Sequence, residues 1–128
     1  MLDYYTPFLE LLRSQLPEGH GILCTSHVGG DPRLPGPATP LDLTEHLETK
    51  IETVQALRAA LNAWAQEKCA PTPKLTLMGH SVGGWLVTEV MRQIDVDAGY
   101  LLFPTLGWIA NSPNGWKLWV NGTRYMYR

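Results

Sequence analysis

The sequence predicts an α/β protein with three layers, in which helices flank a short parallel sheet of about three strands. Two observations predict this class. Short apolar runs alternate with amphipathic segments along the 128 residues, and strands separated by helices pair in parallel through right-handed crossovers. A Gly-rich turn also joins one of the apolar runs directly to the amphipathic segment that follows it. The length suits a single domain.

Three segments show the apolar spacing of amphipathic helices, at residues 5–16, 43–68 and 82–94. In the first segment Thr6 is the expected N-cap, and Pro7 occupies the first helical position. The second segment is the longest helix that the sequence predicts.

Three short apolar runs, at residues 21–26, 74–78 and 98–103, are expected to form buried strands. The first two helices are separated by the first run and by residues 27–40, which contain four prolines and three glycines. That composition predicts a surface loop, either a lid or a tolerated insertion.

Composition excludes several classes of function. The formal net charge is −2 and no basic cluster is present, so nucleic acid is not an expected partner. Cys24 and Cys69 lack paired spacing and clustered histidines, which indicates reduced thiols, no metal site and no cofactor. No leader peptide is recognised at Met1, and the most apolar window is too short to cross a bilayer.

A G-x-S-x-G pattern formed by Gly79, Ser81 and Gly83 stands between a predicted strand and a predicted helix, the context of a nucleophile elbow. Ser81 is therefore the candidate nucleophile. The backbone N–H of Val82, at a helix N-terminus, is the candidate oxyanion donor. Gly79 and Gly83 are expected to avoid a collision across the turn, and Gly84 to let the helix approach the strand. The alternatives are a Gly-rich turn with a solvated serine and a phosphate-binding turn, although the lysine of the latter is absent.

The segments "LTLMGHSVGGWL" and "YLLFPTLGWIANSPNG" resemble those of the lipid droplet-associated hydrolases. "DYYTPFLELL" and "CTSHVGG" are also similar to that family, and the combination of "LLFPT" with "SPNG" is more specific than the elbow. The resemblance covers residues 1–118, as a partial α/β-hydrolase core, and leaves residues 119–128 as a divergent aromatic tail.

The resemblance implies an α/β-hydrolase fold and a serine ester hydrolase that acts on sterol esters or neutral lipids through an acyl-serine intermediate. It implies Ser81 as nucleophile and the amide of Val82 as one oxyanion donor. A lipid ester is the implied substrate, and the cytoplasmic surface of lipid droplets is the implied location. Strands at both ends, the catalytic histidine and the catalytic acid are implied to be missing from this chain, so an internal fragment that is inactive alone is expected.

Four histidines could accept the proton of Ser81. His27 follows the first predicted strand at the same sheet edge, but the resemblance implies a missing strand between the two, so His27 is expected to line the pocket. His80 is expected to point away from Ser81, against the core or along the pocket. His20 and His46 are expected at the surface.

The candidate acids are Asp31, Asp95 and Asp97, and none makes a convincing triad member, since the last two precede the third strand at its amino end. If a central strand is missing, residues 21–26 and 74–78 are expected either to lie apart or to pair directly.

Two functions stay open: a serine ester hydrolase, and a non-catalytic module that keeps the hydrolase core for binding lipid or protein. Acyl transfer through the same elbow is a third class. Aromatic and basic side chains crowd the tail, which suits either a droplet surface or a stub that packs under a cap.

Overall fold

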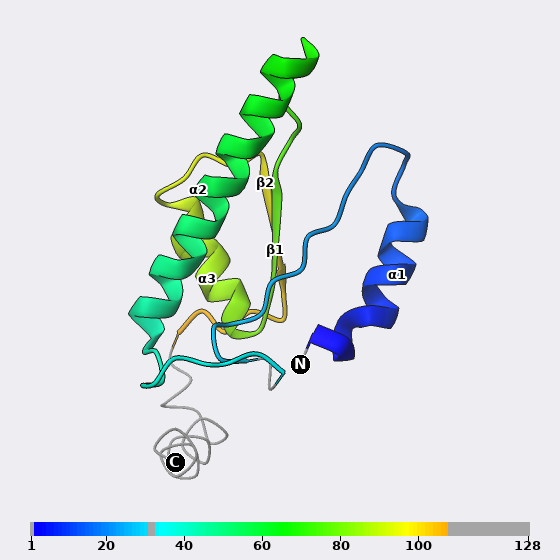
Figure 1. The fold of residues 1–128 in the computed structure, drawn as a ribbon. Helices are drawn as coiled ribbons and strands as arrows, with labels where there is room; N and C mark the ends of the chain where they lie inside the picture. The colour runs from blue at the N-terminus through cyan, green and yellow to red at the C-terminus, as the bar shows by residue number, and fades with distance from the viewer. Residues whose placement is uncertain (1, 31–32, 108–128) are drawn as a thin grey trace. The chain divides into compact units, whose positions relative to one another are not determined.

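The computed structural model describes residues 2–30 and 33–107 and divides the chain into two units, residues 1–42 and 43–128. Each unit is considered by itself. The predicted aromatic tail at residues 119–128 lies outside the described residues. The elements follow one another as η1, α1, α2, β1, α3 and β2 (Figure 1).

The second unit is built on two parallel strands, β1 (Thr76–His80) and β2 (Ala98–Leu102). Their register pairs Thr76 with Ala98 and continues residue by residue to His80 with Leu102. Within the described residues this sheet has two strands. The predicted parallel pairing is therefore confirmed for the second and third apolar runs.

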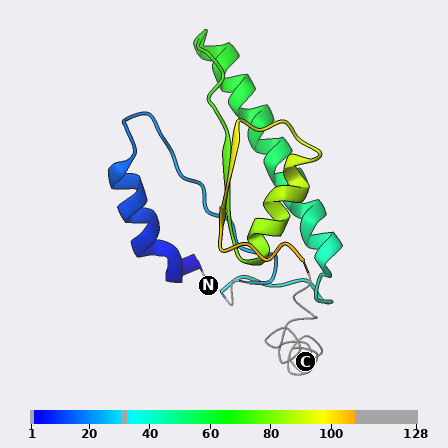
Figure 2. The ribbon, with the colours of Figure 1, turned by 180° about the vertical axis from the view of Figure 1, so that it is seen from behind.

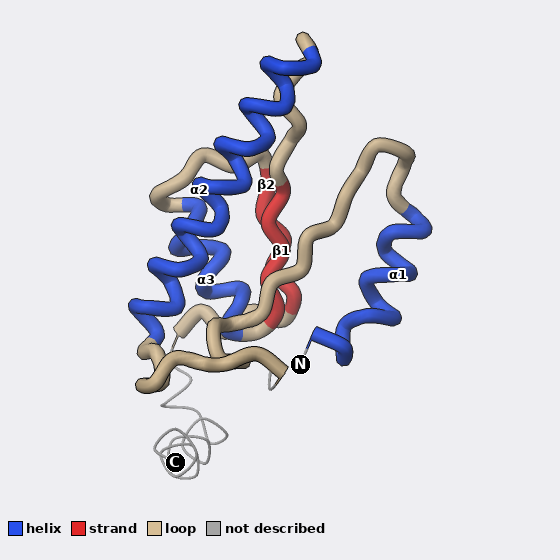
Figure 3. The backbone as a smooth tube through the Cα atoms, viewed as in Figure 1, coloured by secondary structure: helices blue, strands red, loops and turns tan. Residues whose placement is uncertain are grey.

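The strand predicted at residues 21–26 is not formed, and this segment has no regular secondary structure (Figure 3). Among the described residues, β1 pairs with β2 alone. The prediction fails because an apolar run becomes a strand only when a neighbour takes up its backbone hydrogen bonds and covers its side chains. Ile22 and Leu23 are exposed instead.

Two helices complete the second unit. The helix α2 (Leu43–Lys68) has the predicted bounds, and α3 (Val82–Met91) begins as predicted but ends three residues before Ile94. The helix α3 packs on both strands, and α2 packs on α3. None of the helices in the described residues combines the length and the hydropathy needed to span a membrane.

The hydrophobic core lies between α3 and its two neighbours. Five hydrophobic side chains are buried there and at the adjoining ends of α2 and β1: Ala65, Leu75, Leu86, Val87 and Val90. At Gly99 a Cβ would overlap the Met91 sulfur, so the missing side chain lets α3 approach β2 closely. Both helices lie on one side of the strands in two opposite views (Figures 1 and 2). The unit therefore contains the sheet and one helical layer, which are two of the three predicted layers.

The first unit contains a short 3₁₀ helix, η1 (Leu2–Tyr5), followed by α1 (Thr6–Gln15). The N-cap of α1 is Tyr5 and makes no side-chain cap bond, so the prediction of Thr6 as the cap is wrong by one residue. Pro7 does lie in the first turn. No residue of α1 is buried, so its apolar face has little to pack against within this unit.

A charged cluster ties together the amino ends of the strands and α2. The Asp97 carboxylate accepts hydrogen bonds from the Leu75 N–H at 2.7 Å and from the Arg58 guanidinium at 3.0 Å. Arg58 also donates to the Pro73 and Asp95 carbonyls at 3.3 and 3.4 Å. The hydrogen bond from the Leu75 N–H and then the hydrogen bond from the Arg58 guanidinium lower the pKa of Asp97 below its ordinary value of 3.8. The ionised form is therefore the one that stabilises the fold.

Replacing Asp97 by Asn should lower the free energy of unfolding at pH 7, because the charge that orients Arg58 is lost. A carboxyl with a lowered folded pKa stabilises the protein above its unfolded value and loses this contribution as the pH falls through the folded pKa. The difference between wild type and D97N, measured by urea denaturation, should therefore shrink as the pH is taken below about 4.

The control is Glu89→Gln, which removes a looser pair with Arg92 at 3.6 Å. Because Arg92 is exposed and the charged groups lie farther apart, this pair contributes little, so E89Q should unfold like wild type at both pH values. Equal stability of D97N and wild type at pH 7 would contradict the role of this cluster.

Candidate functional site

Ser81 is held in an unusual backbone conformation at the turn between β1 and α3. Its φ is 55° and its ψ is −121°, a combination that residues with a Cβ rarely adopt and that costs about 1–3 kcal/mol. The turn stands at the carboxyl end of β1, directly before the first residue of α3. This is the strained strand-to-helix turn that a nucleophile elbow requires.

Three backbone hydrogen bonds fix this conformation. The Ser81 N–H donates to the Leu102 carbonyl at 3.0 Å, and the Ser81 carbonyl accepts from the Thr105 N–H at 3.0 Å. The same carbonyl accepts from the Gly84 N–H at 2.9 Å. Ser81 is thus pinned both to its own helix and to the segment that leaves β2, which makes its strained backbone part of the fold.

At two of the three predicted elbow glycines, Gly79 and Gly84, a side chain would collide with neighbouring atoms. A Cβ at Gly79 would overlap the Gly83 carbonyl and approach the Gly84 nitrogen to 2.7 Å. A Cβ at Gly84 would lie 2.6 Å from the Pro104 Cβ, so Gly84 admits the chain that follows β2. A Cβ at Gly83 would meet no atom within 4 Å. The predicted collision at Gly83 is therefore wrong: its backbone carbonyl, and not a missing side chain, forms the close contact with Gly79.

The Ser81 hydroxyl does not cap α3, although serine is a favoured N-cap residue. Within this unit its recorded partner is the Thr105 hydroxyl, at an Oγ–Oγ1 distance of 3.4 Å, which is long for a bond between hydroxyls. Ser81 is half-buried. The hydroxyl is thus weakly held and makes no capping bond to the helix.

The first turn of α3 presents N–H groups beside this hydroxyl. Val82 is the first residue of the helix, and N–H groups at the start of a helix have no carbonyl of the preceding turn to bond, although the Gly84 N–H donates to the Ser81 carbonyl. Their partial positive charge, undiminished by a capping side chain, favours a negatively charged oxygen at this position.

His80 is exposed, so the prediction that it packs against the core is wrong, whereas its role along a pocket stays a prediction. Its ring lies edge-to-face with that of Phe103, with ring centroids 6.5 Å apart. His20 is exposed as predicted and its Nδ1 lies 3.1 Å from the Pro17 carbonyl. His46 is half-buried, so its prediction as a surface residue holds only in part. His27 is half-buried in the first unit, and its role as a pocket residue stays a prediction.

The two candidate acids in the described residues, Asp95 and Asp97, do not reach the elbow. Asp97 belongs to the charged cluster at the amino ends of the strands, as its position before β2 predicted. The backbone carbonyl of Asp95 accepts a hydrogen bond from Arg58 in the same cluster. Asp31 lies outside the described residues.

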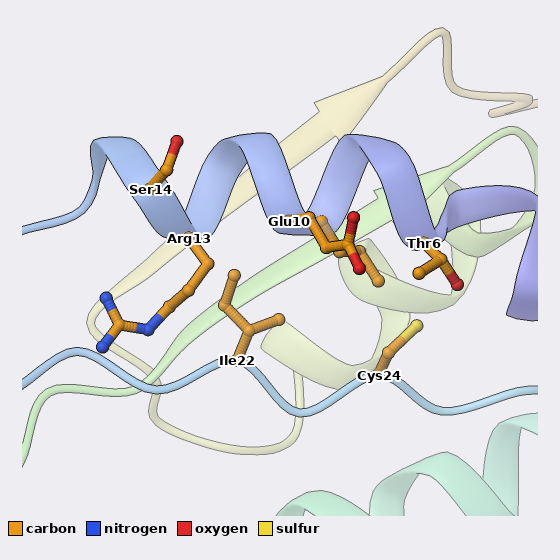
Figure 4. A pocket seen from close by; sticks show the side chains of 7 residues that line it. Thr6, Glu10, Arg13, Ser14, Ile22 and Cys24 are labelled. Carbon is orange, nitrogen blue, oxygen red and sulfur yellow. The ribbon is translucent and has the colours of Figure 1, made fainter.

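A shallow hollow lies in the first unit, between one face of α1 and the segment after it (Figure 4). Its lining consists of Thr6, Leu9, Glu10, Arg13, Ser14, Ile22 and Cys24. Because one helix and one irregular segment form it, the hollow is open, and its side chains include no paired nucleophile and base.

Sequence reasoning missed two residues of this site, Phe103 and Thr105. Both belong to the "LLFPT" segment that carried the family resemblance. The signal was present, but a linear pattern does not say that this segment folds back over Ser81. The pairing of β1 with β2 brings the "LLFPT" segment next to Ser81.

Replacing Gly79 by Ala should destabilise the protein by about 1–3 kcal/mol, the usual cost of inserting a methyl group where backbone already fills the space. The matched control is Gly83→Ala four residues later, where the methyl group meets open space. Since alanine is the better helix former, G83A should be neutral or stabilising by up to about 1 kcal/mol. Urea denaturation of both variants measures the contrast, and equal losses of stability would contradict the described packing.

Replacing Ser81 by Gly should leave the protein more stable than replacing it by Ala, by about 1 kcal/mol, because glycine adopts positive φ without strain. Both variants lose the bond to Thr105, so the comparison isolates the backbone. Thr53, within α2, supplies the control: there Ala should be more stable than Gly, in the order of helix propensity. The same order at both positions in thermal unfolding would show that Ser81 is not strained.

Comparison with known proteins agrees with the resemblance. Residues 1–127 match the family model described as "Lipid-droplet associated hydrolase", so the match extends beyond residue 118. The chain is 32% identical over 126 residues to the lipid droplet-associated hydrolase of Rattus norvegicus, with 88% of this chain and 36% of the relative covered.

Two further relatives carry the same name. The protein of Mus musculus is 30% identical over 125 residues, with 88% of this chain and 36% of the relative covered. That of Drosophila melanogaster is 27% identical over 128 residues, with 88% and 38% covered. No solved structure matches the chain. The chain thus spans little more than a third of the length of these relatives, and it belongs to the lipid droplet-associated hydrolase family.

Proposed function

We propose that Ser81 is the nucleophile of a carboxylic ester hydrolase, which acts through an acyl-serine intermediate. The observation that supports this most is the backbone of Ser81, strained at φ 55° and pinned by three hydrogen bonds. Strain of this kind concentrates at functional sites. A serine that merely ended a loop would relax or be replaced by glycine.

In this mechanism the Ser81 Oγ attacks the ester carbonyl carbon, and a general base takes the hydroxyl proton. The carbonyl oxygen becomes an oxyanion, which the Val82 N–H stabilises. Collapse of the tetrahedral intermediate transfers the proton to the departing alcohol and leaves the acyl group on Ser81. Water then attacks the acyl-serine, and the acid is released.

The base is the part of the mechanism for which residues 43–107, the described part of the second unit, offer no partner of the Ser81 hydroxyl other than Thr105. The recorded partner of the hydroxyl is Thr105, whose side chain is not a general base at neutral pH. We assign the base to a histidine, oriented by a carboxylate, from outside residues 43–107. Loss of the base from a serine triad lowers turnover by several orders of magnitude.

The relatives are named lipid droplet-associated hydrolases, which supports a hydrolase that works at lipid droplets. The substrate in this proposal is a lipid ester, such as a sterol ester or a neutral lipid, and the location is the cytoplasmic surface of the droplets. The same elbow would also serve acyl transfer, if an alcohol replaced water in the second step. The alternative is a non-catalytic module that binds lipid or protein, which the hydroxyl pairing of Ser81 with Thr105 favours.

A fluorophosphonate probe tests the nucleophile, because its phosphorus bonds only to an activated serine. Labelling, followed by intact-protein mass spectrometry, should occur once per chain and be lost completely in Ser81→Ala. The control Ser14→Ala, which removes an exposed hydroxyl of α1, should leave labelling unchanged.

Imidazole added to the same reaction supplies a proton acceptor from solution. If the base is absent near Ser81, the labelling rate should rise with imidazole concentration. No labelling with or without imidazole, or labelling that survives in S81A, would contradict the nucleophile and favour the non-catalytic module.

A further inference from the structure

Phe103 has an unfavourable backbone conformation and an unfavourable exposure. It lies between the two residues, Leu102 and Thr105, whose backbones bond to Ser81. Phe103 follows β2 directly and has a φ of 45°, a region that residues with a Cβ avoid. Its side chain is 88% exposed, although phenylalanine is among the residues most often buried. Neither feature stabilises the described unit.

The neighbours of Phe103 explain how this conformation is enforced. On one side the Leu102 carbonyl accepts from the Ser81 N–H, and on the other the Thr105 N–H donates to the Ser81 carbonyl. Pro104 fits against Gly84. With the chain fixed before and after it, Phe103 is turned outward at the same end of the sheet as the Ser81 hydroxyl.

The surroundings of the ring are apolar or aromatic. His80, the residue before Ser81, meets the Phe103 ring edge-to-face at 6.5 Å. Val82 and Leu106, which flank the elbow and the β2 exit in sequence, are 39% and 53% exposed. Exposed apolar side chains therefore stand directly after Ser81 in the chain and three residues after Phe103.

We propose that Phe103, supported by His80, binds the unbranched acyl chain of the ester whose carbonyl reacts at Ser81. This inference rests on the proposed function for the position of the carbonyl. An extended hydrocarbon chain is the occupant that fits, because it needs apolar contact area and no hydrogen-bond partner. A ring fixed by strained backbone supplies such area with little loss of freedom on binding. Each methylene covered contributes about fourfold in affinity.

The chain offers a direct test, since it contains two phenylalanines, Phe8 and Phe103. Incorporation of 4-fluorophenylalanine gives two ¹⁹F resonances, and Phe103→Leu assigns them. Titration with sodium octanoate, decanoate and dodecanoate, each below its micelle concentration, should shift the Phe103 resonance to saturation. The dissociation constant should fall at least threefold for each added pair of methylenes. Phe8, on α1 and 44% exposed, should not shift over the same range.

Three outcomes would overturn the inference: no shift of Phe103, parallel shifts of Phe8 and Phe103, or a dissociation constant independent of chain length. Before fatty acid is added, a soluble gadolinium chelate should broaden the Phe103 resonance. An unbroadened resonance would mean that protein already covers the ring, which excludes an acyl chain there. Circular dichroism checks that F103L keeps its fold.

The fatty acid contains no ester bond, so its binding does not depend on a reactive serine. Titration of Ser81→Ala should therefore give the same shift of Phe103 as wild type. Fluorophosphonate labelling without a Phe103 response would refute this inference alone. A Phe103 response without labelling would refute the nucleophile alone.

Discussion

The conformation of Ser81 is the constraint on which the second unit depends. Its backbone joins β1 to α3 within one residue, and its N–H and carbonyl hold the segment that leaves β2. If Ser81 relaxed to an ordinary conformation, α3 would leave the strands at another angle and the bond to Thr105 would break. The close contact of Gly79 with Gly83 shows how little room this turn leaves. The strain at Ser81 is therefore balanced by the packing of the whole unit.

The two ends of the parallel strand pair are held by different kinds of interaction. At the amino end, Asp97 and Arg58 join β1, β2 and α2 through a carboxylate and a guanidinium. At the carboxyl end, β1, α3 and the segment after β2 are joined by backbone hydrogen bonds and close glycine contacts. The bonds given for Ser81 there join uncharged groups. The two ends of the strand pair therefore differ in the bonds that hold them, which include charged groups around Asp97 and only uncharged groups in the bonds given for Ser81.

Local patterns predicted the helices and the turn well, whereas contacts distant in sequence were not accessible to them. The bounds of α2 and the start of α3 follow from apolar spacing and flanking residues, which act within a few turns. The run at residues 21–26 has the same composition as a buried strand, but strand formation also needs a neighbour, which composition does not specify. Ser81 and its glycines were predictable because the elbow is a local motif. Phe103, Thr105 and the pairing of Arg58 with Asp97 were not, since each depends on how β2 lies beside β1.

The position of the Ser81 hydroxyl and its reactivity depend on different parts of the protein. The strained turn and the N–H groups of α3 need only β1, α3 and the exit of β2, all of which lie within residues 76–105. Activation of the hydroxyl needs a base, and Thr105 is a neutral partner at a long distance. In the function proposed above, this turn would place the serine, the oxyanion donor and the acyl contact, while a group outside residues 76–105 would set the rate. For this reason substrate contacts and nucleophile activation require separate measurements in this protein.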